Sequence, residues 1–133
     1  MQDKSKLFVN GTPKYIACYE AKRNPTGDRF TVVYTHTNWY DPENKDKVFY
    51  IAMSEHPAHP QGFGQHRESW AWRFYPRGSR ITFEELPVDC QRVVITDYCN
   101  LWGIGQFELH TEGGQVRVRN VFEIKMGHSH KYH

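Results

Sequence analysis

The sequence contains few cysteines and no long apolar run, and both absences narrow the class of protein. Its three cysteines, Cys18, Cys90 and Cys99, are odd in number and form no Cys-x-x-Cys pair, which argues against a disulfide framework and against a zinc knuckle. Nowhere do about 18 apolar residues run together, and the first residues form no apolar segment of the kind that a secretory signal needs. We therefore expect reduced thiols and a soluble, cytoplasmic protein without a membrane partner.

An excess of charge of one sign is also missing. The chain has 17 basic and 15 acidic side chains, a formal net charge of +2, and no charged tail that would dictate a polyanionic partner. The phosphate-binding loop Gly-x4-Gly-Lys-Ser/Thr, the nucleophile elbow Gly-x-Ser-x-Gly and the zinc motif His-Glu-x-x-His are all absent. These absences favour a non-catalytic protein over an enzyme.

Aromatic residues are what the sequence has in abundance. They make up 15% of 133 residues, which is enough to pack one domain, residues 1–133, around large side chains. No repeat and no internal linker divides the chain. Residues 127–133 are polar and rich in histidine, and we expect them to form a flexible tail.

The pattern of apolar and turn residues predicts an α+β protein. Segments rich in aromatic and β-branched residues alternate with turns, and Asn10-Gly11 and Gly113-Gly114 are two-residue hairpin signals. We expect a strongly bent antiparallel sheet or a partly open barrel of about seven strands, with one helix packed on it. The expected strands are residues 6–9, 15–19, 30–37, 48–53, 70–75, 80–84, 106–112 and 115–125.

One segment, residues 87–102, has helical periodicity. Its apolar residues recur at offsets that place them in one stripe, Pro87 suits a first turn, and Gly103 suits a C-terminal cap. Residues 93–96 are all β-branched, which would suit a strand instead. The stripe and the end signals together favour the helix.

The stretch from Ser54 to Glu68 is the most distinctive in the chain. Pro57 and Pro60 prevent a helix or a central strand, and Gly62 and Gly64 allow a sharp turn around Phe63, so we expect a loop. A backbone stiffened by prolines loses little entropy on binding, which is typical of a recognition loop. The candidate residues for binding a protein partner or small ligand are His56, His59, Gln61, Phe63, Gln65, His66 and Glu68.

Three alternatives assign chemistry to other residues. His56, His59 and His66 could hold a divalent metal such as zinc and activate a water, which would make the protein a metal-dependent hydrolase. Arg73, Arg117 and Arg119, beside the aromatic side chains of residues 70–75, could bind single-stranded nucleic acid by stacking and phosphate contacts. Cys90, in the first turn of the expected helix, could be a nucleophile, although a buried structural cysteine is the commoner case. We favour a binding protein without a cofactor.

The pattern His-Pro-x-Gly-Phe-Gly-Gln-His at residues 59–66, with the segments 80–87 and 90–92 downstream, resembles a set of small uncharacterised proteins of bacteria and their phages. The resemblance covers residues 48–102. It implies that the protein has a cytoplasmic accessory role and is encoded by a phage or prophage. It carries no activity that could be transferred.

Overall fold

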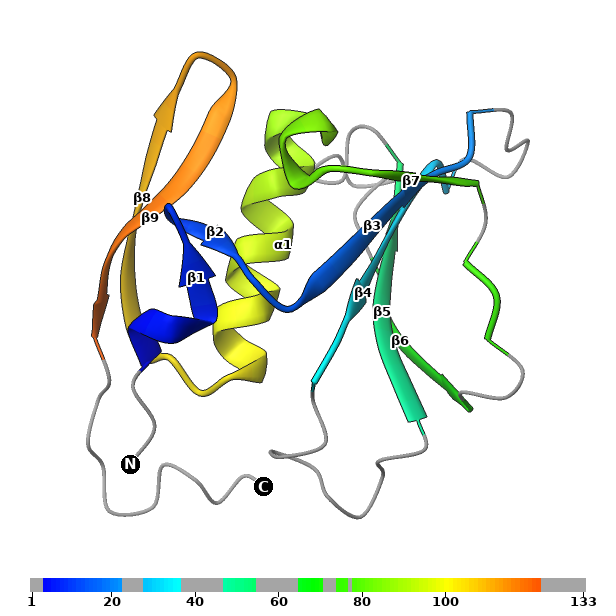
Figure 1. Ribbon diagram of the computed structural model, residues 1–133, viewed down its shortest axis with the longest axis horizontal. Helices are drawn as coiled ribbons and strands as arrows, with labels where there is room; N and C mark the ends of the chain where they lie inside the picture. Colours follow the sequence, from blue (N-terminus) through cyan, green and yellow to red (C-terminus); the bar gives the residue numbers. More distant parts are fainter. Residues whose placement is uncertain are drawn as a thin grey trace.

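The computed structural model describes residues 4–22, 28–36, 47–54, 65–70, 74–76 and 78–122. In this part of the chain one α-helix, α1 (Val88–Leu101), lies between a larger antiparallel sheet and two hairpins, as Figure 1 shows. The strands are β1 (Phe8–Val9), β2 (Thr12–Pro13), β3 (Ile16–Glu20), β4 (Phe30–Tyr34), β5 (Lys47–Met53), β6 (Gln65–Trp70), β7 (Ser79–Ile81), β8 (Gln106–Glu112) and β9 (Gln115–Phe122). Two 3-10 helices, η1 (Lys4–Leu7) and η5 (Phe83–Glu85), precede β1 and α1.

The larger sheet has the strand order β6-β5-β4-β3-β7, and every neighbouring pair is antiparallel. Side chains alternate between its two faces, so Phe30, Val32 and Tyr34 of β4 are buried while Thr31 and Val33 are half-buried. Register extends the buried face to the neighbouring strands, because Val32 pairs with Cys18 of β3 and with Ile51 of β5. This face forms one wall of the hydrophobic core, in which the buried residues of α1 also lie.

Residues 93–96 are helical despite their β-branched side chains. Val94 and Ile95 are fully buried in the core. Burying each of them stabilises the fold by about 2 kcal/mol, whereas the helix propensity of four β-branched residues costs about 2 kcal/mol in total. Gly103 follows the helix with φ +73°, and its N–H donates to the Asn100 carbonyl at 3.2 Å. The predicted helix 87–102 is confirmed.

Both predicted hairpin turns are present. Asn10 and Gly11 have φ values of 52° and 81°, and Gly113 and Gly114 have φ values of 61° and 77°, as a two-residue turn with positive φ at both central positions requires. The first turn also packs on the second hairpin, since the Val118 N–H donates to the Gly11 carbonyl at 2.9 Å. The two hairpins therefore stand next to each other, as Figure 1 shows.

The α+β class and the antiparallel pairing are confirmed, but the expectation of one bent sheet or partly open barrel is wrong for the described residues. The strands form a five-stranded sheet and two separate two-stranded sheets. The helix explains the separation. Cys90 and Cys99 lie about 180° apart around a helix, yet both are fully buried, so α1 packs against neighbours on two sides and keeps the sheets apart.

Three boundaries also differ from expectation. The predicted loop 54–68 is wrong at its C-terminal end, because Gln65–Trp70 is strand β6 and pairs with β5. Residues 65–70 contain no proline or glycine that would prevent this pairing. The predicted strand 80–84 ends at Ile81, where η5 takes over. Of the predicted strand 70–75, Trp70 belongs to β6, residues 71–73 lie outside the described residues, and residues 74 and 75 form no strand. The expected tail, residues 127–133, lies outside the described residues.

Among the described helices, none has the length and apolar character needed to cross a membrane.

Candidate functional site at strand β7

Several strand ends meet where α1 begins. Strands β5 and β3 end at this side of the larger sheet and β4 and β7 begin there, as the antiparallel order requires. Ser54, the residue after β5, is tied to the helix, because the Cys90 thiol donates to its carbonyl at 3.3 Å. Residues 55–64, the distinctive part of the sequence, thus leave the described structure from a fixed point beside the N-terminus of α1.

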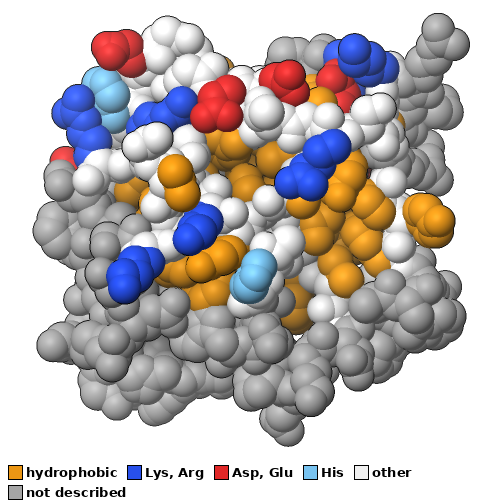
Figure 2. All heavy atoms as spheres, in the orientation of Figure 1, with side chains coloured by type: hydrophobic (Ala, Val, Ile, Leu, Met, Phe, Trp, Pro, Cys, Tyr) orange, Lys and Arg blue, Asp and Glu red, His pale blue; other side chains and the backbone are white. Residues whose placement is uncertain are grey.

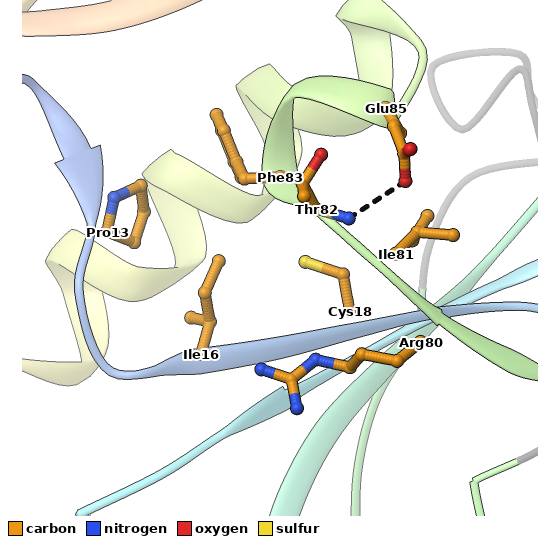
Figure 3. Close-up of a pocket in the computed structure, with 8 residues that line it drawn as sticks. All are labelled: Pro13, Ile16, Cys18, Arg80, Ile81, Thr82, Phe83 and Glu85. Carbon is orange, nitrogen blue, oxygen red and sulfur yellow. Dashed lines mark hydrogen bonds between the residues drawn. The ribbon is translucent and has the colours of Figure 1, made fainter.

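A pocket of about 440 Å³ opens between β3, β7 and η5. We call it the Phe83 pocket. Figure 3 shows Ile16 and Cys18 pointing from β3 toward η5, while the Arg80 side chain runs along the other side of β3. Its walls are partly apolar and partly polar; the lining residues are Pro13, Ile16, Cys18, Arg80, Ile81, Thr82, Phe83 and Glu85.

A second pocket, of about 670 Å³, lies at the start of β7, and we call it the Lys22 pocket. It is lined by Glu20, Ala21, Lys22, Gly78, Ser79, Arg80, Ile81 and Glu85. Arg80, Ile81 and Glu85 line both pockets. The two pockets therefore meet at β7 and form one recessed surface around this short strand.

Two local features of the sequence build this surface. Gly78 has φ +90° and lies so close to the Glu20 carbonyl that a Cβ would collide with it, so only glycine brings β7 this near to β3. After Ile81 the Thr82 N–H donates to the Glu85 carboxylate at 2.9 Å, which starts η5 and turns the chain away from β3. Strand β7 is therefore short, and among the described residues it pairs with Cys18, Tyr19 and Glu20 of β3 alone.

The charged groups around β7 are unequally compensated. Glu20 binds Arg29 at 2.6 Å, Glu84 binds Arg117 at 3.3 Å, and the Glu85 carboxylate accepts the Thr82 N–H. The exposed Arg80 guanidinium lies over the Tyr19 ring, 5.8 Å from its centre, and Lys22 is also exposed. Within the described ranges neither of these two cations binds a carboxylate. Glu85 keeps its negative charge, so the cations Lys22, Arg29 and Arg80 outnumber the carboxylates Glu20 and Glu85 by one around the pockets. Basic and acidic side chains are interspersed along the upper edge of the face in Figure 2.

The cysteines are structural in this arrangement. Cys18 reaches the Phe83 pocket, but burial raises the pKa of its thiol to about 12, so the thiolate is not populated near neutral pH. Burial likewise raises the pKa of Cys99 to about 12. Cys90, the nucleophile considered from the sequence, is fully buried with its thiol directed to the Ser54 carbonyl. It packs as a core residue.

The structure describes only some of the residues of the predicted recognition loop. His56, His59, Gln61 and Phe63 lie outside the described residues. The others belong to β6, where Gln65 pairs with Ala52, His66 with Ile51 and Glu68 with Phe49 of β5. Their backbones are part of the sheet ladder and not of the loop.

The residues of the alternatives are likewise described only in part. Arg117 is half-buried, and its guanidinium donates to the Val116 carbonyl at 3.0 Å besides binding Glu84. Arg119 is exposed on the same strand, and Arg73 lies outside the described residues. Among the residues that the structure describes, no three histidine, cysteine, aspartate or glutamate side chains come together as metal ligands.

Comparison with known proteins gives no match: no family model, no curated protein and no solved structure is similar to this chain. The functional argument therefore rests on the surface around β7. Sequence reasoning did not find this surface, although the Thr82-x-x-Glu85 capping box was a visible signal that the strand ends early.

Proposed function

We propose that the protein is a small non-catalytic binding protein that holds its partner at the end of the molecule where α1 begins. The observation that carries the proposal is the pair of pockets that meet at β7. The Phe83 pocket has apolar side chains such as Ile16 and Phe83 in its walls, and the Lys22 pocket is lined largely by charged ones; a combination of apolar and polar groups is typical of recognition sites. Residues 55–64, with the histidines and Phe63 that suit recognition, start from Ser54 at the same end of the sheet.

The elements that carry the pockets are anchored on the hydrophobic core. The pockets are built on β3, β7 and η5, and these elements adjoin the core through Cys18 and Phe83, which are both buried. A site on such a frame needs little rearrangement when a partner binds, so little of the interaction energy is lost to ordering. This is what an accessory or adaptor role requires.

Photo-cross-linking in the cells that express the protein tests the proposal. The photoreactive residue p-benzoylphenylalanine replaces Lys22 at the pocket in one variant and Phe63, whose phenyl ring it retains, in a second. Arg119, an exposed residue of β9, is replaced in a matched control. We expect positions 22 and 63 to cross-link to one and the same partner and position 119 to remain unlinked. No adduct at position 22 or 63, or equal adducts at all three positions, would refute the proposal.

A further inference from the structure

We infer that the group bound at β7 is an extended acidic segment of a partner protein, which adds to the larger sheet as a further strand. This inference rests on the proposed function and specifies its mode of recognition. Three observations carry it: the position of β7 in the sheet, the two pockets beside it, and the uncompensated cations at its rim.

In the part of the chain that the structure describes, β7 is the last strand at its side of the larger sheet. In an antiparallel sheet the backbone N–H and C=O groups of an edge strand alternate between its neighbour and the open side. Some backbone groups of Ser79, Arg80 and Ile81 therefore point away from β3, and no strand in the described part of the chain pairs with them. An added strand would bond to these groups.

The pockets fit the side chains of such a strand. A strand that adds to a sheet edge gains affinity from backbone hydrogen bonds and specificity from pockets that receive alternate side chains. The Phe83 pocket and the Lys22 pocket meet at β7 through Arg80, Ile81 and Glu85. At about 440 Å³, with Ile16 and Phe83 in its walls, the Phe83 pocket has room for one apolar side chain.

A simpler explanation is that the charge of Arg80 and the shortness of β7 only protect this edge of the sheet from aggregation, as charges on short edge strands often do. Protection needs a charge and a short strand. It does not need recessed surfaces that meet at the strand, nor a glycine that draws the strand against β3, as Gly78 does.

Charge selects the kind of segment. Around the pockets the three cations Lys22, Arg29 and Arg80 outnumber the two carboxylates Glu20 and Glu85, and the described residues offer Lys22 and Arg80 no carboxylate partner. Carboxylates of a partner would complement these cations. A second copy of this chain is disfavoured, because a two-fold pairing of β7 with itself brings two Arg80 side chains together and like charges across strands repel.

Peptide selection on the purified protein tests the inference. A library of random 12-residue peptides displayed on phage is selected on the wild-type protein and, in parallel, on Arg80→Glu and on Arg119→Glu. Both arginines are exposed, so both variants should keep the wild-type melting temperature. We expect wild type and Arg119→Glu to enrich peptides that alternate acidic and apolar residues, and Arg80→Glu to bind these peptides at least about tenfold more weakly.

Amide hydrogen exchange then reports the mode of binding. With the best enriched peptide bound, the amides of residues 79–81 should exchange more slowly, because backbone bonding to the added strand protects them. Any of five results would overturn the inference: enrichment of basic peptides, no enrichment, undiminished binding to Arg80→Glu, unprotected β7 amides, or a wild-type dimer held through β7. Cross-links at positions 22 and 63 would still support the proposed function in any of these cases, so the two failures are distinguishable.

Discussion

The buried amide of Gln91 joins the helix to the second hairpin, and its removal should cost a large part of the protein's stability. Gln91 is fully buried. Its Oε1 accepts the Val116 N–H at 2.8 Å, and its Nε2 donates to the Leu86 carbonyl at 2.8 Å and to the Gly114 carbonyl at 3.4 Å. One side chain thus satisfies backbone groups of the residue that follows η5, of the β8–β9 turn and of β9.

The variant Gln91→Met keeps the length of the side chain and removes its hydrogen-bonding groups. The Val116 N–H loses its acceptor and the Leu86 carbonyl loses a donor, both in the interior. Leaving a buried backbone group unsatisfied costs about 1–3 kcal/mol, and the greater hydrophobicity of methionine returns about 1 kcal/mol, so we expect a net loss of about 2–4 kcal/mol. For a domain of this size, that loss lowers the melting temperature by roughly 10 °C.

Urea unfolding, followed by tryptophan fluorescence, measures the loss. Trp102 is buried and provides the signal. The matched control is Thr96→Met, which introduces the same residue at an exposed position of the same helix and should change the free energy of unfolding by less than about 0.5 kcal/mol. If Gln91→Met is as stable as Thr96→Met, the amide does not hold the hairpin to α1 and the account of this joint is wrong.

Two further predictions concern stability. Cys18 and Cys99 hold their protons in the folded protein until about pH 12, because burial raises the pKa of each, whereas unfolded thiols ionise near pH 9. The unfolded state therefore binds fewer protons than the folded state above pH 9. The free energy of unfolding should be flat from pH 7 to 8 and then fall by up to about 1.4 kcal/mol per pH unit for each thiol. Measured by urea midpoints, the fall should be shallower in Cys18→Ala than in the wild type, and an equal fall would refute the assignment. Gly78→Ala should destabilise the protein by at least about 2 kcal/mol, because the added methyl group meets the Glu20 carbonyl. Gly103 also has positive φ but has open space around it, so Gly103→Ala should cost only about 1 kcal/mol. Equal decreases in the melting temperature of the two variants would contradict this difference.

The elements that the sequence predicts well are those set by neighbouring residues. The turns at Asn10-Gly11 and Gly113-Gly114 need positive φ at two successive positions, which few other residue pairs supply. The helix follows from a stripe of apolar residues and from its end signals. In each case the decisive contacts span only a few residues of chain.

The sheet arrangement depends on contacts between distant parts of the chain, and for this reason the barrel prediction failed. Strand β7 pairs with β3, about sixty residues earlier, and no local pattern specifies that partner. The sequence of the helix does carry a signal for the layers around it. Cys90 and Cys99 project to opposite sides of it, and apolar residues on both sides indicate a helix between two layers.

The candidate site escaped prediction for the same reason. The histidines and glycines of residues 54–68 stand out in the sequence because their residue types are unusual. The surface around β7 consists of ordinary residues, and Ile16, Arg80 and Phe83 come together in one pocket only when β3, β7 and η5 meet. Such a surface can be recognised only from the fold.

The features that shape the surface also serve the packing of the domain. The Glu85 carboxylate that ends β7 by accepting the Thr82 N–H also opens η5, and η5 places buried Phe83 and Leu86 in the core and leads directly into α1. A longer β7 would cover the edge of β3, but it would remove this entry to the helix. The short strand, the open edge and the recess beside it are therefore consequences of how α1 is started. Because the core depends on the same residues, the surface is held in place without any partner, as a preorganised binding site requires.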